Sequence, residues 1–531
     1  MNKLRNLFII ALFAAAPGCH AQAQQSEQFT TDVCVYGATP AGIMAACAAK
    51  SEGKSVVLIE PGRRIGGMTA GGLGWTDLYH PEILKGYARM FYERVAAYYG
   101  ETGLKLTFEP KVAHRIFQHF LSDNGVSDVL MSHRIIAAEK EDNRIVAITV
   151  EDATDTSRQA TVRARVFLDC SYEGDLMARA GVSYTIGREA NATYGETGNG
   201  VQLREKHQFP DGVDPYVVKG DPSSGLLWGI SPEPVGAIGS GDRHVQAYNF
   251  RLTLTRNAAN RIAITDAVPD NYDPARYELL IRLKEKSPWQ SYEDCLKWSP
   301  MPNDKCDMNN QGAFSTDMIG ESYDYPEASY AEREAIYKRH LDYTLGLLYF
   351  MWTDERIPAN IRQDLAQWGW PRDEYEDNNH ITPQLYIRES RRMLGRMVMT
   401  QAHCERNTDV EDPIGYADYT MDSHNCGRYV VNGMVKNEGD VQIYLSKGPY
   451  PISYRAVTPK EEEACNLIVP VCLSASHIAF GSIRMEPVYM MLGESCGLAA
   501  CEAIDHHAGC VQQVDAGKVM TRFNNIERTT K

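Results

Sequence analysis

The sequence predicts an α/β protein, in which a parallel sheet covered by helices is interrupted by an inserted α+β domain. Three observations support this fold class: a strand–helix–strand pattern near the N-terminus, a strand-rich stretch after two helices, and a change in composition after residue 194. At 531 residues the chain exceeds the size that one hydrophobic core usually supports, so we expect two joined domains.

An apolar strand, a glycine turn, a helix and a second strand follow one another between residues 33 and 60. Gly37 permits the tight turn and Gly42 lets the helix lie close to the sheet, so that a pyrophosphate can bind at the helix N-terminus. Glu60 ends the second strand, where an acid binds a ribose hydroxyl. Thr39 replaces the middle glycine of G-x-G-x-x-G, which limits the approach of the backbone to phosphates. This Rossmann-like pattern predicts dinucleotide contacts from Gly37, Thr39, Pro40, Ala41, Gly42 and Glu60.

A second glycine-rich stretch at residues 65–74 follows Glu60 closely. Its glycines let backbone amides approach a flat, anionic ligand without interference from side chains. A nicotinamide enzyme has no need of such a stretch. The predicted ligand contacts are Gly66, Gly67, Met68, Gly71 and Gly72.

The next part of the chain changes from helical to strand-like periodicity. Apolar residues recur with helical spacing across residues 82–99 and 111–124. Short apolar runs separated by turns then predict strands at 129–131, 134–138, 145–150 and 162–168. Helices followed by a strand meander and a return strand are not typical of a plain nicotinamide-binding domain.

The composition shifts to Pro, Asp, Tyr and Trp between residues 194 and 384. This part contains a predicted strand at 246–254 and a predicted helix at 329–347, and we interpret it as an inserted substrate or cap domain. It divides the first domain into residues 30–193 and 385–531, and the second of these parts closes with a helix expected at 493–506.

Four later stretches carry a resemblance to a known family: residues 164–175, 386–392, 421–424 and 474–500. With them the chain resembles the bacterial FAD-dependent oxidoreductases of the glutathione-reductase type, some members of which carry the name xanthan lyase. The resemblance implies non-covalently bound FAD, a Rossmann-like FAD-binding domain and further cofactor contacts from Asp169, Gly174 and Asp175.

Tuning of a reduced flavin requires positive charge near its pyrimidine edge. A helix opening at residues 493–497 would direct its backbone amides and its positive end there. We therefore expect cofactor contacts from Gly493, Glu494 and Gly497.

Oxidation of an alcohol or amine needs a base, and a histidine titrates close enough to neutrality to serve. The sequence offers His424 and His477 in motifs similar to those of the family. Arg484 is the predicted clamp for a substrate anion or oxyanion. Arg455 is a further candidate for that role, as are Arg388 and Arg392, which stand four apart on an expected helix, where they can also pair with Glu389 or the FAD pyrophosphate.

We therefore expect an oxidoreductase that transfers a hydride between FAD and a small polar molecule. The aromatic content and the export predicted below favour a carbohydrate or polyol as the substrate. The residues do not define the electron acceptor. One alternative is reduction of an activated double bond, as in fumarate-reductase-like relatives. An alternative from another class is a polysaccharide lyase or carbohydrate-binding protein without flavin, which would leave the glycine-rich stretches without a role.

The charge and the N-terminus indicate the compartment. A net charge of -15 argues against nucleic acid and against an anionic membrane surface, and the mature region has no apolar run that spans a bilayer. Basic residues before an apolar run, followed by Ala21-Gln-Ala23, predict a signal peptide over residues 1–23 and a periplasmic or secreted protein. A lipoprotein anchor at Cys19 is the weaker alternative, because Pro17 fits that motif poorly.

The thirteen cysteines fall mostly in predicted strands and helices, where a free thiol behaves as a small apolar residue. Cys295 and Cys306 flank a loop and form the most credible disulfide. His506 and His507 lack partners at ligand spacing, so no metal site is predicted.

Overall fold

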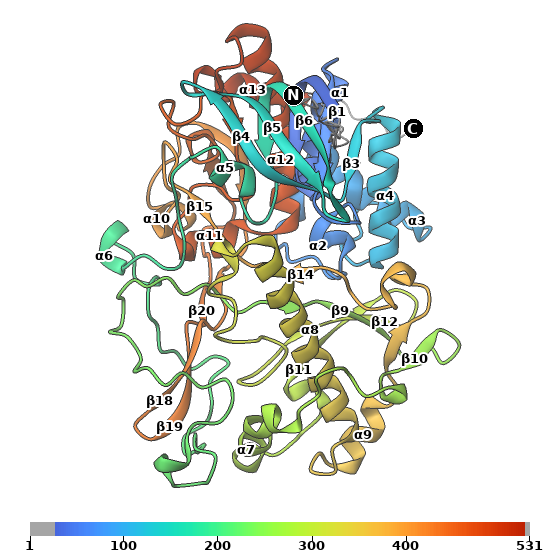
Figure 1. The fold of residues 1–531 in the computed structure, drawn as a ribbon, viewed down its shortest axis with the longest axis vertical. Helices are drawn as coiled ribbons and strands as arrows, with labels where there is room; N and C mark the ends of the chain where they lie inside the picture. Colours follow the sequence, from blue (N-terminus) through green and yellow to red (C-terminus); the bar gives the residue numbers. More distant parts are fainter. Residues whose placement is uncertain (1–26, 526–531) are drawn as a thin grey trace, which may run out of the picture.

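The computed structural model describes residues 27–525 and divides into two halves along its long axis (Figure 1). The upper half contains one sheet with the strand order β3-β2-β1-β6-β5-β4, and β22 pairs with β6 beyond this path. The strands of this sheet are β1 (Glu27–Tyr36), β2 (Val56–Glu60), β3 (Val129–Met131), β4 (His133–Glu141), β5 (Arg144–Asp152), β6 (Asp155–Asp169) and β22 (Leu467–Ile468).

The strand β6 joins two different kinds of pairing. Its first part pairs antiparallel with β5, which itself pairs antiparallel with β4. Its later part lies parallel to β1 and β22, while β1 and β2 are parallel to each other. The meander and return strand predicted from the sequence are therefore confirmed.

Residues 33–36 of β1 explain why this strand lies at the centre of the upper half. All four side chains are fully buried. Val33 and Val35 belong to the main core with the covering helices, whereas Cys34 and Tyr36 face a second core beneath the meander. A strand that is covered on both faces needs such a continuous apolar run.

Helix α1 (Pro40–Ser51) begins as the sequence predicts. Thr39 is its N-cap in extended conformation, and Pro40 stands at the first helical position, where its missing N–H leaves no bond unmade. The other helices of this half are α2 (Gly67–Ala70), α3 (Gly86–Tyr98), α4 (Pro110–Asp123), α5 (Asp175–Arg179), α10 (Gln401–Cys404), α11 (His477–Ile483), α12 (Glu486–His506) and α13 (Ala516–Asn525).

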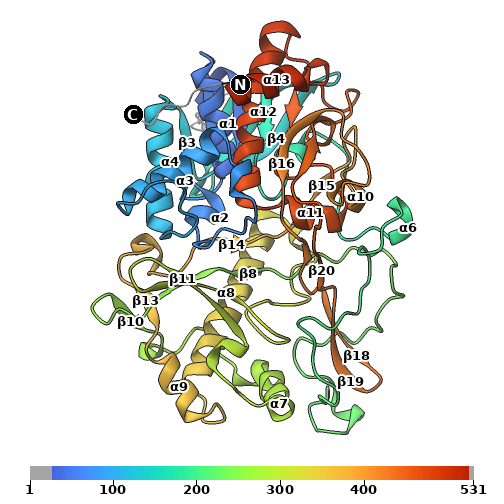
Figure 2. The same cartoon turned by 180° about the vertical axis from the view of Figure 1, so that it is seen from behind.

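The lower half is built around an antiparallel sheet with the order β10-β13-β9-β12-β11, along which the long helix α8 runs (Figure 1). Its elements are β9 (Leu252–Thr255), β10 (Arg261–Ala263), β11 (Leu296–Met301), β12 (Lys305–Asn310), β13 (Gly369–Pro371), α7 (Glu278–Lys286), α8 (Tyr330–Thr353) and α9 (Ala359–Leu365). Both views show that the hairpin of β18 (Gly427–Val431) and β19 (Met434–Glu438) also reaches into this half (Figure 2).

Short antiparallel pairs of strands complete the fold. These pairs are β7 (Tyr184–Thr185) with β15 (Arg392–Met393), β8 (Asn249–Phe250) with β14 (Leu385–Tyr386), β16 (Pro413–Ala417) with β21 (Tyr450–Ser453), and β17 (Met421–Ser423) with β20 (Val441–Ile443). A short helix, α6 (Asn191–Tyr194), follows β7.

Two local expectations are corrected by the structure. The single strand expected over 246–254 is split at Arg251 into β8 and β9. Arg388 and Arg392 do not share a helix, because residues 387–391 run without helical structure between β14 and β15. Both guanidinium groups are buried, and the non-helical backbone sends them to different carboxylates, Asp317 and Glu189.

The disulfide expected between Cys295 and Cys306 does not form, and both thiols are free and buried. The register of the hairpin explains this outcome, because Cys306 lies opposite Pro300, whereas Cys295 precedes β11. No helix within residues 27–525 has both the length and the apolar character needed to cross a membrane. The predicted signal peptide and Cys19 lie outside the described residues.

Candidate cofactor and active site

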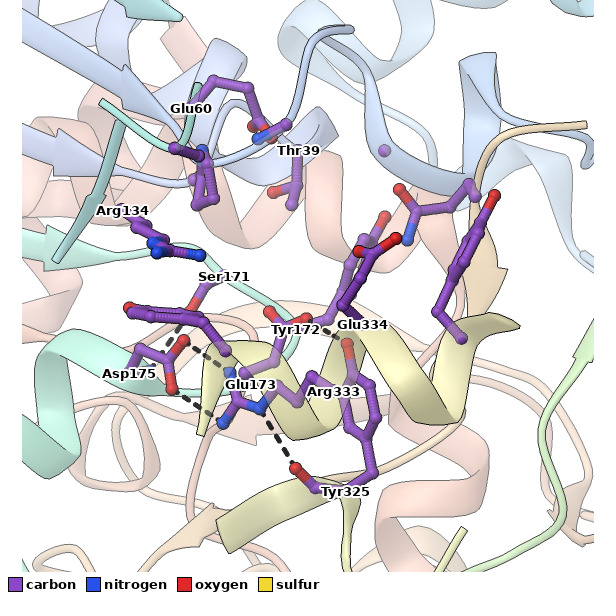
Figure 3. A pocket seen from close by; sticks show the side chains of 18 residues that line it. Thr39, Glu60, Arg134, Ser171, Tyr172, Glu173, Asp175, Tyr325, Arg333 and Glu334 are labelled. Atoms are coloured by element: carbon purple, nitrogen blue, oxygen red, sulfur yellow. Dashed lines mark hydrogen bonds and ion pairs between the residues drawn. The ribbon is translucent and has the colours of Figure 1, made fainter. Parts of the chain in front are cut away.

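A cavity of about 310 Å³ opens where the carboxyl ends of β1, β2 and β6 meet the first turns of α8 (Figure 3). This edge of a parallel sheet is where open α/β folds bind their ligands. The cavity is lined by Gly37, Thr39, Glu60, Pro61, Gly62, Gly67, Arg134, Ala153, Ser171, Tyr172, Glu173, Asp175, Tyr325, Tyr330, Arg333, Glu334, Tyr337 and Gln384.

The glycine turn is packed so tightly that side chains are excluded from it. A Cβ at Gly42 would lie 1.8 Å from the carbonyl oxygen of Gly37, and a Cβ at Gly37 would lie 2.7 Å from the amide nitrogen of Ser171. Thr39 occupies the middle position, where its hydroxyl donates to the carbonyl of Cys170 at 2.8 Å and caps α1. The threonine thus closes the turn with a hydrogen bond that a glycine cannot make.

Glu60 lies at the cavity wall, as predicted for an acid that binds a ribose. Its carboxylate accepts hydrogen bonds from the amides of Ala38 and Gly62, each at 2.7 Å. Burial raises the pKa of Glu60 to about 7 despite these two bonds. Pro40, Ala41 and Gly42 do not line the cavity themselves, but form the first turn of the helix that opens towards it.

The turn after β6 supplies a second wall. Asp169 accepts from the amide and hydroxyl of Ser171 and from the amide of Met177, so it shapes the turn and does not face the cavity. Gly174 adopts the left-handed conformation within this turn. Asp175 lines the cavity, where Arg333 binds its carboxylate in bidentate fashion at 2.7 and 2.9 Å (Figure 3).

The second glycine-rich stretch packs against Tyr172. A Cβ at Gly67 would lie 2.3 Å from the Tyr172 hydroxyl oxygen, which accepts a hydrogen bond from the amide of Met68 at 3.0 Å. Tyr172 and Thr69 donate in turn to the buried carboxylate of Glu486 at 2.8 and 2.9 Å. Burial raises the pKa of Glu486 to about 7, so this group holds a proton more readily than an ordinary glutamate.

The remaining glycines of this stretch support its course. The Gly66 amide donates to the carbonyl of Ala38 at 2.8 Å and thereby ties the two glycine-rich segments together. A Cβ at Gly71 would meet the side chain of Gln384, and a Cβ at Gly72 would lie 2.2 Å from the carbonyl oxygen of Arg251. The stretch therefore runs between the cofactor cavity and the lower half.

The expected role of residues 493–497 is corrected. Helix α12 begins at Glu486, so Gly493 and Gly497 lie in its interior, where backbone amides are bonded within the helix. A Cβ at Gly493 would lie 2.1 Å from the Ala41 carbonyl, so the two glycines serve close packing of α12 on α1. Glu494 accepts from the amide of Tyr87 near the start of α3 and is not a cofactor contact.

A second cavity of about 200 Å³, here called the catalytic cavity, is lined by residues of both halves, and its Arg251 packs against Gly72 of the glycine-rich stretch. Its lining is strongly polar. It consists of Asp77, Lys206, His207, Arg251, Lys297, Asn309, Asn310, Gln311, Tyr386, Tyr419, Asp422, His424, Gln442, Arg484 and Met485. Of the three predicted catalytic residues, His424 and Arg484 meet here.

His424 is held by two carboxylates. Its Nδ1 lies 2.9 Å from the carboxylate of Asp317, and its Nε2 lies 3.4 Å from that of Asp422. Burial and the charge of Arg388 lower the pKa of His424, but the two carboxylates outweigh them and raise it above its usual value. With Nδ1–H donating to Asp317, Nε2 is the nitrogen that can accept a proton.

Arg484 lies on the same wall. Its Nη1 donates to the hydroxyl of Tyr386 at 2.8 Å, and its Nη2 donates to Asp422 at 3.3 Å. Burial would raise the pKa of Asp422, but His424 and Arg484 outweigh this effect and hold the pKa below its usual range. The three groups form one charged cluster that faces the cavity.

His477 is not part of this wall. Its Nδ1 lies 2.7 Å from Glu389, its Nε2 lies 2.9 Å from the hydroxyl of Ser423, and only 2% of the residue is exposed. His477 does not line the catalytic cavity and both of its nitrogens are hydrogen-bonded, so it is a positioning residue behind β17 and not the expected proton acceptor.

The other candidate arginines also lie elsewhere. Arg388 pairs with Asp317 at 2.9 Å behind His424, Arg392 pairs with Glu189, and Arg455 pairs with Asp412 near the surface. Sequence reasoning missed Asp317, Arg134 and the residues at the start of α8. The helix itself was predicted, but no local pattern indicates which of its residues face the cofactor cavity.

Solved flavoenzymes resemble only part of the chain. OxyS anhydrotetracycline hydroxylase from Streptomyces rimosus matches with 13% identity and a TM-score of 0.24, over 34% of this chain and 36% of that one. THI4 from Thermovibrio ammonificans matches with 19% identity and a TM-score of 0.23, over 30% of this chain and 66% of that one. The chain spans half the length or less of the first three such structures. No curated protein matches its sequence.

The family model described as FAD dependent oxidoreductase matches residues 32–523, which is nearly the whole described chain. The close-packed glycines of the turn, the acid at the end of β2 and the cavity at the sheet edge fit the adenosine and pyrophosphate part of FAD. The chain therefore belongs to the FAD-dependent oxidoreductase family.

Proposed function

We propose that the protein oxidises a neutral polar substrate, a carbohydrate or polyol, by hydride transfer to FAD in the catalytic cavity. The observation that carries this proposal is the Asp317–His424 pair, because His424 lines a polar cavity whose Arg251 packs against Gly72 of the glycine-rich stretch. A base held in one orientation, next to the cofactor, is what removal of a hydroxyl proton requires.

The lining of the catalytic cavity supports a substrate with several hydroxyl groups. Amide side chains, lysines and carboxylates all line it, so a ligand meets both donors and acceptors. The charges nearly balance, because Asp307 neutralises Arg251, and Asp77 and Asp422 face Lys206, Lys297 and Arg484. A balanced wall favours a neutral ligand over a strongly charged one.

The reaction follows from the roles of these side chains. FAD, when bound, supplies the acceptor for the hydride that leaves the substrate carbon. His424 accepts the hydroxyl proton at Nε2, and the Asp317 carboxylate stabilises the imidazolium that results. Arg484 and Tyr386 orient the substrate oxygen as it becomes a carbonyl. The product is an aldehyde, ketone or lactone.

The test is anaerobic reduction of the purified holoprotein. We expect neutral sugars or polyols to bleach the flavin absorption band. His424→Gln should retain the flavin but slow bleaching by about 10²-fold to 10⁴-fold. Failure of all such substrates to bleach the flavin, while dithionite does so, would rule out the proposed substrate class.

A second candidate reaction is delivery of hydride to an activated double bond. The buried, positively charged Arg484 favours this alternative, because it can clamp an anionic substrate and protonate it. Reoxidation of the chemically reduced protein by an activated alkene, but not by other acceptors, would identify this direction.

The alternative of a lyase or binding protein without flavin is not retained, because the family match and the glycine turn both indicate FAD. We further propose export, supported by the N-terminal sequence pattern. N-terminal sequencing of the protein from its native cells should begin at Gln24. A chain that still begins at Met1 would contradict export by this signal.

A further inference from the structure

A third cavity, of about 630 Å³, lies in the lower half and is separate from both sites described above. Its walls come from the loop of residues 228–244, the segment 319–323 and the start of β18. It shares no lining residue with the cofactor cavity or with the catalytic cavity. The proposed reaction does not use it.

Arg428 of β18 lines this cavity and lacks a counter-charge. Only 3% of the residue is exposed, and no carboxylate of residues 27–525 forms an ion pair with it. Its Nε donates to the Asn437 side chain at 2.9 Å, and its Nη2 lies 3.4 Å from the carbonyl of Ala313. Its Nη1 lies beside Gly229 on the cavity wall, where a Cβ would come within 3.1 Å.

The surroundings of Arg428 stabilise its charge only weakly. Its guanidinium lies 5.4 Å from the ring centroid of Phe209 and 5.2 Å from that of Phe314. Such contacts replace little of the hydration that burial removes. Burial accordingly lowers the pKa of Arg428 to about 10, with no carboxylate to offset the effect. An anion in the cavity would supply the missing counter-charge.

The walls beside Arg428 are aromatic. Trp228 stacks on Tyr343 at 5.2 Å, and Tyr323 stacks on His244 with ring centroids 4.0 Å apart and planes 6° from parallel. Tyr429 and Ile319 complete the apolar lining. These rings are fixed by their own contacts, so a flat ligand can bind against them without reordering them.

The acidic residues at this cavity limit the charge of the ligand. Arg188 lies between the carboxylates of Asp242 and Glu438, so this group of three keeps one net negative charge. Glu233 and Glu321 line the cavity as well, and the nearest cation to Glu321 is Arg339 at 3.8 Å. Arg428 is a single positive charge without an ion-pair partner, and the carboxylates around it repel further negative charge, which favours a monoanion over a polyanion such as a nucleotide.

We propose that this cavity is a second ligand site, which binds a small organic monocarboxylate with a flat apolar body. The carboxylate pairs with Nη1 of Arg428, and the apolar body lies against the ring of Tyr323. Two short segments connect this cavity to the catalytic cavity. One runs from Asp317 to Tyr323 and the other from His424 to Arg428, and each spans only a few residues.

Isothermal titration calorimetry of the mature holoprotein tests the proposal, with benzoate as the probe. We expect saturable one-to-one binding of benzoate, and binding of neutral benzamide or inorganic phosphate that is weaker by about tenfold or more. Arg428→Gln should weaken benzoate binding by a similar factor, and Arg428→Lys should restore part of it. Lys297→Met, which changes the catalytic cavity, should leave benzoate affinity unchanged.

A second variant guards against misfolding of Arg428→Gln. Gly236→Phe adds a ring at the exposed rim, where its Cβ would lie 3.1 Å from Val201 Cγ2 and 3.3 Å from Ser240 Oγ; small shifts of these side chains relieve both contacts, so the variant should block benzoate with little change in melting temperature. No saturable benzoate binding to the wild type, equal binding to Arg428→Gln and wild type, or loss of binding only in Lys297→Met would each overturn the proposal.

Discussion

Asp317 and His424 are separated by 107 positions in the sequence, yet their side chains lie 2.9 Å apart and form the pair that faces the catalytic cavity. Asp317 comes from the lower half, whereas His424 follows β17. The pair fixes which imidazole nitrogen is free to accept a proton. Its geometry therefore determines how activity depends on pH.

Replacing Asp317 by Asn should move the acidic limb of the pH profile of kcat/KM to lower pH. The base must be neutral to act, so activity falls as pH drops through the pKa of His424, which Asp317 raises. Asn removes the carboxylate and lowers that pKa. Asp440→Asn is the matched control, because Asp440 pairs with His207 in the same cavity at 2.7 Å and should leave the limb in place. An unchanged limb in Asp317→Asn would show that another group is the base.

Gly42→Val should abolish retention of FAD. The new Cβ would lie 1.8 Å from the Gly37 carbonyl oxygen, so the glycine turn must open. The measurement is the ratio of flavin to protein absorbance after gel filtration. Gly53→Asn serves as the control, since Gly53 has open space around it and asparagine tolerates its positive φ. Normal flavin content in Gly42→Val would contradict the assignment of this turn to the cofactor.

Glu486→Gln should change the pH dependence of stability in the cofactor-free protein. Burial raises the pKa of Glu486 to about 7 in the folded state, from an ordinary value of 4.5. Because the pKa of this carboxyl is higher in the folded than in the unfolded protein, its contribution to stability is complete below the pKa of the unfolded state. The contribution is lost as pH rises through 7. The variant has no such titration, so its free energy of unfolding should not fall in this way. Between pH 5 and pH 8 it should rise relative to that of the wild type by up to about 3 kcal/mol.

Urea unfolding at the two pH values measures this difference. Tyr172 donates to Oε1 of Glu486 and Thr69 donates to Oε2; in the variant the glutamine carbonyl can accept from Tyr172, and its amide group can donate to the Thr69 hydroxyl. The gain should therefore come from the removed titration alone. A constant difference between wild type and variant across this range would show that Glu486 is ionised normally.

Gly493→Val should destabilise the upper half by about 3 kcal/mol or more, because a Cβ there would lie 2.1 Å from the carbonyl oxygen of Ala41. Ser495→Ala on the same helix should cost less than about 1 kcal/mol, since its hydroxyl bonds only to carbonyls of its own helix. Thermal unfolding compares the two variants. Equal melting temperatures of the two variants would mean that α12 can move away from α1 without loss of stability.

The sequence by itself determined the parts of the fold that depend on local pattern. The run at 33–36, the glycines at 37 and 42 and the acid at 60 are specified by short-range rules, because strand burial, turn geometry and helix capping each involve neighbouring residues. Family resemblance added FAD, and the family match confirms it.

The tertiary structure alone decided which candidates meet. Side chains alternate along β17 and the residue that follows it, so Asp422 and His424 face the cavity while Ser423 points back to His477. The sequence offered both histidines on equal terms, and only long-range packing separates the proposed base, His424, from the positioning residue, His477. The same holds for Gly493, whose role depends on Ala41, a residue more than 400 positions away that the fold brings into contact with it.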